Sequence, residues 1–185
     1  MDFAHLLARL DALLRQRRPA YYATLGPPAP VAELAEFETE FSLALPPELR
    51  MWWSWRNGQT GFESFYGNQC LQSASSAAET MQVQLDLLDE FAPNWWRPTW
   101  VPFLENGGGD HLCLDLEGTF TGQPGQILEH WHDWEPRTVC FPNLTTWLAA
   151  VVAAYEQGTD PLTDEQVAKL ELVSPAGFPQ EFAAG

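Results

Sequence analysis

The sequence predicts an α+β fold, in which several helices cover one face of a mainly antiparallel β-sheet. Helical patterns fill the first ninety residues, strand patterns follow them, and another helical pattern comes after the strands. Residues 100–116 read as two strands around a glycine turn, with Leu112, Leu114 and Leu116 on one side. The connections are short, and short connections join antiparallel neighbours because a parallel crossover needs about a dozen residues.

The N-terminal half is expected to supply most of the helices. One helix over residues 2–18 begins after an aspartate cap and ends in a cluster of arginines, and two more lie within residues 31–58. We expect Gly58 to end the third helix as a left-handed cap. A fourth helix, over residues 76–91, opens with a capping box that begins at Ser76.

The second half is expected to complete the sheet and to add one helix. Strands are predicted over residues 127–134 and 137–141, and Asn143 is expected to cap the helix that follows. Residues 1–160 then form one domain with an extra N-terminal helix over residues 2–18. Residues 161–185 form a short C-terminal extension.

The composition restricts the possible partners. Nine Lys and Arg residues oppose twenty-five Asp and Glu residues, which gives a formal net charge of −16. A chain of this charge repels nucleic acid and anionic membranes and attracts basic partners. Three widely spaced cysteines indicate reduced thiols, and the sequence shows no signal peptide and no apolar run of membrane-spanning length. We expect a cytoplasmic protein with a basic protein partner.

One side of the second strand carries groups that could bind a metal. His111, Cys113 and Asp115 alternate with leucines, so we expect them to face water. A tetrahedral site needs further ligands, which His130 and His132 could supply, but the spacing matches no known ligand motif. The favoured interpretation is a solvated polar face, with no metal and no cofactor.

A carboxylate pair is the second chemical alternative. Asp110 and Asp115 could act as the acid and base of a hydrolase, but their spacing along one strand points them to opposite faces. Asp110 follows three glycines and is better explained as a turn former whose carboxylate accepts hydrogen bonds from nearby amides. No nucleophile elbow, zinc-protease helix or P-loop motif is present in the sequence. We therefore expect no catalytic residue and no enzymatic activity.

Tryptophans in and beside loops are the best candidates for a partner-binding surface. Large aromatic side chains ringed by polar groups are the usual anchors of protein interfaces. The alternative is that these tryptophans belong to an aromatic-rich core. The candidate residues are Trp95, Trp96, Glu129, Trp131, Asp133, Trp134 and Glu135.

Several short motifs follow one another in a defined order along the chain. Their residues are Leu45, Pro46, Asn57, Gly58, Trp100, Pro102, Gly109, Asp110, Asp115 and Trp147. Each motif alone is weak, but their order and spacing over about residues 30–155 resemble the SUKH superfamily. This superfamily contains a yeast cell-wall-assembly regulator and many bacterial toxin-immunity proteins.

The resemblance implies a helix-flanked antiparallel sheet of about six strands and an interaction module without established chemistry. Bacterial members typically bind and neutralise a toxin, often a nuclease or a deaminase. The first expectation is therefore an immunity protein for a cognate toxin. A regulatory or scaffolding module with an endogenous partner is the alternative, and an uncharacterised hydrolase is the third.

Overall fold

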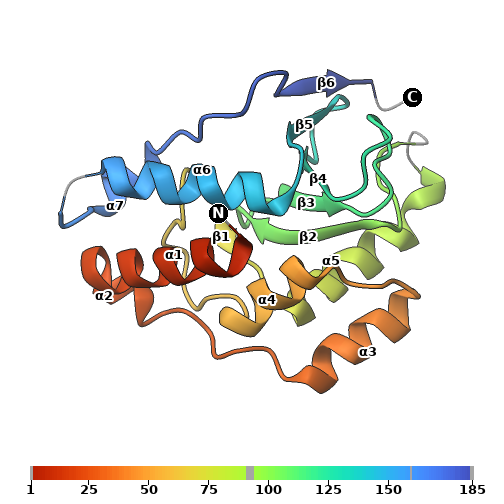
Figure 1. Ribbon diagram of the computed structural model, residues 1–185. Helices are drawn as coiled ribbons and strands as arrows, with labels where there is room; N and C mark the ends of the chain where they lie inside the picture. Colours follow the sequence, from red (N-terminus) through yellow and green to blue (C-terminus); the bar gives the residue numbers. More distant parts are fainter. Residues whose placement is uncertain (1, 91–93, 159, 184–185) are drawn as a thin grey trace.

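The computed structural model describes residues 2–90, 94–158 and 160–183. It confirms the predicted α+β class: one antiparallel sheet has its strands in chain order from β1 to β6, with helices packed against it (Figure 1). The strands are β1 (Cys70–Leu71), β2 (Trp100–Glu105), β3 (His111–Asp115), β4 (Gln126–His130), β5 (Arg137–Phe141) and β6 (Gln180–Phe182).

Seven α-helices lie in the described ranges, together with one short 3-10 turn, η1 (Leu88–Glu90). No helix in these ranges is both long enough and apolar enough to cross a lipid bilayer. The helices are α1 (Phe3–Arg17), α2 (Pro19–Tyr22), α3 (Val31–Phe41), α4 (Pro47–Trp55), α5 (Ala74–Asp86), α6 (Leu144–Gln157) and α7 (Asp164–Ala168).

Helices α1 and α6 begin where the sequence predicted. The Asp2 carboxylate accepts a hydrogen bond from the His5 amide at 2.8 Å, and the Asn143 side chain accepts one from the Thr146 amide at 2.8 Å. Each bond satisfies an amide that has no partner within its helix. The two helices pack against each other through their leucine- and valine-rich stripes.

The junction between α4 and α5 differs from the prediction. Helix α4 ends at Trp55 with Arg56 as its cap, and Gly58 lies beyond it with a φ of +79°. A β-carbon at Gly58 would lie 2.9 Å from the Ser73 amide nitrogen, so glycine is required by close approach as well as by φ. Asn57 bonds the Ala74 amide at 2.7 Å and thereby supports the start of α5.

The predicted capping box at Ser76 is wrong by three residues. Helix α5 is capped by Ser73, whose hydroxyl accepts a hydrogen bond from the Ser76 amide at 3.1 Å. Asn57 supplies a second acceptor at this end from a distant part of the chain, which a local motif cannot reveal. The predicted end of this helix, at residue 91, lies outside the described residues.

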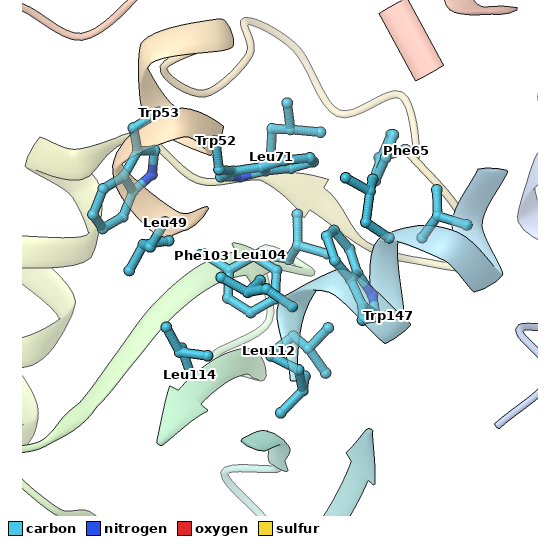
Figure 2. Packing of buried hydrophobic residues seen from close by; sticks show 14 of the residues in the cluster. Leu49, Trp52, Trp53, Phe65, Leu71, Phe103, Leu104, Leu112, Leu114 and Trp147 are labelled. Carbon is cyan, nitrogen blue, oxygen red and sulfur yellow. The ribbon is translucent and has the colours of Figure 1, made fainter. Parts of the chain in front are cut away.

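The helix-facing side of the sheet is an aromatic core. Trp52 of α4 and Trp147 of α6 pack with ring centroids 5.2 Å apart, and Trp147 lies 5.0 Å from Phe103 of β2 (Figure 2). Leu112 and Leu114 of β3 lie on the same side, as their alternation predicted. Burial of such large apolar side chains is the main contribution to folding stability.

The opposite side of the sheet is buried too, so the prediction of a solvated polar face is wrong. His111, Cys113 and Asp115 are all buried, and the register pairs them with His130, Leu128 and Gln126 of β4. The segment before β2 covers this face with Trp96, which contacts both histidine rings. Local alternation shows which residues share a face, but it cannot show that a distant loop covers that face.

The C-terminal segment packs on the domain. Strand β6 pairs with β5 and provides the sixth strand, while Val167 of α7 and Leu162 are buried in the core. The Arg18 guanidinium, itself buried, binds the Asp164 carboxylate at 2.7 Å. A capping box formed by Thr163 and Gln166 opens α7.

Candidate protein-binding surface

The β4–β5 loop, residues 131–136, presents aromatic and acidic side chains to solvent. The predicted strand over residues 127–134 is wrong at its end, because β4 stops at His130 and the chain then turns. Trp131 is 38% exposed and Trp134 is 54% exposed. Asp133 and Glu135 lie in the same loop and are exposed as well.

Buried Arg137 holds this loop in place. Its guanidinium donates hydrogen bonds to the carbonyl oxygens of Trp131, Trp134 and Pro136, at 3.4, 2.5 and 3.1 Å. It also donates two bonds to the Trp95 carbonyl, at 3.0 and 3.3 Å, and lies 4.6 Å from the Trp95 ring centroid. Burial lowers the pKa of Arg137 to about 10, which still leaves it charged at neutral pH.

Sequence reasoning missed Arg137 as a residue of the site. A signal was present, because Arg137 lies two positions before Val139 in a predicted strand and therefore shares its inward side. An arginine that alternates with core residues has to find acceptors inside the protein. Loop carbonyls next to a tryptophan cluster are such acceptors.

The four candidate tryptophans separate into two groups. Trp96 is 1% exposed and packs against His130 at 5.0 Å and Trp100 at 6.0 Å between ring centroids. As the prediction of Trp96 as an accessible anchor conflicts with this burial, we treat Trp96 as a core residue. Trp95 is partly buried between His130 and Arg137, whereas Trp131 and Trp134 are exposed.

A second fixed point joins the β4–β5 loop to the glycine turn between β2 and β3. One oxygen of Asp110 accepts a hydrogen bond from the His132 amide at 2.9 Å and lies 2.8 Å from His132 Nδ1. The other oxygen accepts one from the Asn106 side chain at 2.6 Å. Asp110 therefore contacts a residue 22 positions further along and the Asn106 side chain, instead of the nearby backbone amides that the sequence predicted.

The turn itself is formed by Asn106. Its side-chain oxygen accepts hydrogen bonds from the amides of Gly108 at 2.8 Å and Asp110 at 3.2 Å. Gly109 has a φ of +97°, which a residue with a β-carbon rarely adopts. Because Asn106 supplies the acceptor for the amides of the turn, one oxygen of the Asp110 carboxylate is available to His132.

Mutual contact shifts the pKa values of both partners in this pair. Burial raises the pKa of Asp110, but hydrogen bonds from the His132 amide, the His132 ring and Asn106 together lower it. The hydrogen bond to Asp110 raises the pKa of His132. The pair is therefore strongest when the carboxylate is ionised and the imidazole is protonated.

Asp115 forms the turn at the other end of β3. Its carboxylate accepts hydrogen bonds from the amides of Glu117, Gly118 and Thr119 at 3.1, 3.1 and 2.6 Å. Gln126 adds a side-chain bond at 2.7 Å. The carboxylates of Asp110 and Asp115 are thus both occupied by donors of the chain itself, and this leaves the hydrolase alternative without a supporting geometry.

The suggested metal triad of His111, Cys113 and Asp115 does not assemble. Within the described residues, the metal-like group with ligand atoms inside 4.8 Å of one another is Asp110, His132 and Asp133. The hydrogen bond between Asp110 and His132 already accounts for their closeness. Burial lowers the pKa of His111 to about 4, so its buried imidazole is neutral at neutral pH.

The cations of the chain are engaged internally. Each of the nine Lys and Arg side chains makes a hydrogen bond or an ion pair with another group of the chain. All twenty-five acidic side chains lie in the described ranges, and five of them pair with a Lys or Arg, leaving twenty that do not. The surface potential is therefore dominated by uncompensated carboxylates.

The family-motif residues lie in the core, the turns and the helix junctions that support this surface. Leu45, Trp100, Pro102 and Trp147 are buried, with Trp100 and Pro102 on the face that carries Asp115 and Cys113. Pro46 directly precedes α4. The remaining motif residues form the turns and the junctions described above, at Asn57, Gly58, Gly109, Asp110 and Asp115.

Comparison with known proteins agrees with the predicted resemblance. The model of the SMI1/KNR4 family (SUKH-1) matches residues 28–150. This range includes strands β1 to β5 and most of the elements that carry the family-motif residues. No curated protein matches the chain. The match covers more than half of the sequence, and the chain belongs to the SMI1/KNR4 family (SUKH-1).

Proposed function

We propose that this protein is a non-enzymatic immunity protein that binds and neutralises a basic cognate toxin in the cytoplasm. The observation that carries the proposal is the β4–β5 loop, where Trp131 and Trp134 are exposed beside Glu129, Asp133 and Glu135. The chain belongs to the SMI1/KNR4 family (SUKH-1), and the resemblance to the SUKH superfamily implies an interaction module of the kind that neutralises toxins in bacteria. The combination of exposed aromatic anchors and carboxylates fits a basic protein partner.

Charge supports the choice of a basic partner. Twenty acidic side chains have no Lys or Arg partner in the chain, and no cation is left over to attract an acidic protein. A field of this sign accelerates the association of a basic partner by steering, and the effect weakens as salt rises. Nucleases and deaminases present basic surfaces to bind nucleic acid, so they fit this requirement.

Preorganisation supports the choice of the loop. Arg137 bonds three carbonyls of the loop, Asp110 bonds the His132 amide, and Glu129 accepts a hydrogen bond from the Trp131 indole at 3.3 Å. Ordering a loop on binding costs free energy, and a loop that is already ordered avoids most of this cost. The tryptophans can therefore act as rigid anchors.

Neutralisation by this surface would be steric and electrostatic. The aromatic side chains would fill a pocket on the toxin, and the carboxylates beside them would occupy the positions of nucleic-acid phosphates. No chemical step is required of this chain.

The test is growth rescue in cells that express the product of the adjacent reading frame. We expect that product to be toxic alone and harmless with the wild-type chain, and the Trp131→Ala/Trp134→Ala double variant to lose rescue. Phe62→Ala is the matched control, because Phe62 is 91% exposed and lies outside the β4–β5 loop. A neighbour that is harmless alone, or toxic regardless of this chain, contradicts the proposal.

Affinity capture separates the regulatory alternative from the immunity function. A scaffolding module would use an endogenous partner, so affinity capture with the wild-type chain would recover a housekeeping complex in cells that lack the adjacent gene. Loss of that complex in the double variant would assign the loop to regulation.

A further inference from the structure

A groove between α3 and α5 lies outside the β4–β5 loop and has no role in the proposed function. The two helices lie side by side at the edge of the helical layer (Figure 1). The groove has a volume of about 510 Å³. Its lining residues are Glu33, Glu36, Phe37, Glu40, Ala74, Ser75, Ala78, Glu79, Gln82 and Val83.

Both walls are regular helix faces. On α3 the lining positions recur with spacings of three, one and three residues from Glu33 to Glu40, and on α5 a similar spacing runs from Ser75 to Val83. Small and apolar side chains line the groove beside the glutamates, and Val83 among them is 56% exposed. Two parallel stripes of this kind form the groove into which a third helix packs in helical proteins.

Phe37 makes the α3 wall rigid. Its ring is buried and lies 5.5 Å from the Trp53 ring and 5.0 Å from the Phe41 ring, between centroids. The groove is therefore preformed by the core and does not need to open for an occupant.

The lining of the groove is acidic, and three of its four carboxylates have no partner within the described part of the chain. Four of the ten lining residues are glutamates, and none is Lys or Arg. Glu33 accepts a hydrogen bond from Asn57 at 3.0 Å, whereas Glu36, Glu40 and Glu79 make no hydrogen bond or ion pair with the described part of the chain. Three free carboxylates beside small and apolar side chains match a ligand with an apolar strip between cationic side chains.

We infer that the α3–α5 groove is a docking site for a basic amphipathic helix of a partner protein. A helix of about three turns matches the eleven residues of α3, which span about 16 Å. Alanine or leucine on its inner face would contact Ala78 and Val83, and lysine or arginine on its flanks would pair with Glu36, Glu40 and Glu79.

A second copy of this chain does not fit the groove as well. The most basic helix of the chain is α1, and its arginines are already engaged. Arg9 binds Glu156, Arg15 binds Asp11, and Arg17 binds backbone carbonyls at the end of α6. Releasing them would break contacts of the fold, so the occupant has to come from another protein.

The test uses two fluorescent 15-residue helical peptides with the same alanine- and leucine-rich face, one flanked by lysines and the other by glutamates. We expect the lysine peptide to bind the wild-type chain at least ten-fold more tightly than the glutamate peptide in fluorescence anisotropy, and more weakly as salt rises. Amide shifts in NMR spectra of the complex should map to α3 and α5.

Two variants locate the binding. Glu36→Lys/Glu40→Lys should weaken the lysine peptide at least ten-fold, while Glu171→Lys/Glu181→Lys, which changes the net charge equally at exposed positions outside the groove, should retain most of the affinity. The inference would be overturned by equal effects of the two double variants or by equal binding of the two peptides. It would also be overturned if spermine, at the same concentration of cationic groups, displaced the labelled lysine peptide as well as the unlabelled lysine peptide does.

This inference is independent of the proposed function. The Trp131→Ala/Trp134→Ala variant should bind the lysine peptide as the wild type does. Binding of the lysine peptide at the β4–β5 loop would contradict the groove as its docking site and would not affect the immunity proposal. Failure of growth rescue would contradict the immunity proposal and would not affect the docking site.

Discussion

The two faces of the sheet are both buried, but their chemistry is different. On the helix-facing side, Phe103 packs against Trp147 and the contacts are apolar. On the opposite side, His111, Asp115 and Arg137 are buried, and the side chains of Asp115 and Arg137 are hydrogen-bonded to backbone groups of neighbouring loops. One face therefore supplies stability that is insensitive to pH, whereas the other positions the β4–β5 loop and makes stability depend on protonation.

The largest expected effect is on the apolar face. Trp147→Ala should lower the free energy of unfolding by about 3–5 kcal/mol, because it leaves a cavity among Trp52, Phe65 and Phe103. Chemical denaturation measures the loss. Trp134→Ala is the matched control, and its exposed side chain should change stability by less than about 0.5 kcal/mol. Similar losses for the two variants would contradict the division between core and binding surface.

The next effect concerns the arginine of the polar face. Arg137→Ala should lower the free energy of unfolding by about 2–3 kcal/mol, because the carbonyls of Trp95, Trp131 and Trp134 lose a buried donor. Arg137→Lys retains the charge without the planar fork, so we expect a smaller loss of stability. Hydrogen exchange should show faster exchange of loop amides in the alanine variant, and unchanged exchange would indicate that Arg137 does not hold the loop.

Acid sensitivity distinguishes the two faces directly. The pKa is about 4 for His111 and about 3 for His130, because burial disfavours the charged imidazole. In the unfolded chain these histidines bind protons below about pH 6.5, whereas in the folded protein they stay neutral. The stability of the folded protein is therefore fully present above that pH and is lost as pH falls toward the folded pKa. At pH 5 each of the two histidines should lower the free energy of unfolding by about 2 kcal/mol relative to pH 7.

The variant His130→Phe should remove its share of this acid loss. Neither ring nitrogen of His130 has a hydrogen-bond partner in the described structure, so phenylalanine forfeits no bond and keeps the contacts with Trp95 and Trp96. Urea denaturation at pH 7 and pH 5 measures the difference. His5→Phe, at an exposed position, should leave the pH dependence unchanged, and an equal effect of both variants would contradict the assignment.

The smallest effect concerns the contact between Asp110 and His132. Asp110→Ala should cost about 1 kcal/mol near pH 5.5. The contribution of Asp110, whose pKa is lowered, is lost as pH falls through its folded value, and that of His132, whose pKa is raised, is lost as pH rises through its own. Thermal melts between pH 4 and 8 should therefore show the largest difference between variant and wild type between about pH 4 and 6.5.

The sequence predicted elements whose signals are local. Asp2 and Asn143 capped their helices as expected, and the alternation of Leu112 and Leu114 correctly identified the helix-facing side of β3. These features depend on residues within a few positions, so a pattern can reveal them. The family model agrees with the motifs that suggested the superfamily.

Features that depend on distant residues could not be predicted. Ser73 replaces Ser76 as the cap of α5 at an end that Asn57 also supports, and Asp110 binds His132 across 22 positions. The loop that covers the polar face buries Trp96, which composition alone cannot distinguish from the exposed Trp134. The partner-binding role of the β4–β5 loop remains a prediction.

We propose that the β4–β5 loop binds the partner while the rest of the chain supports the loop. The most direct measurement is the calorimetric Kd of the toxin identified by growth rescue, for the wild type and for Trp131→Ala/Trp134→Ala. We predict binding at least about 100-fold weaker for the double variant, at an unchanged melting temperature. An unchanged Kd at the same melting temperature would contradict the claim.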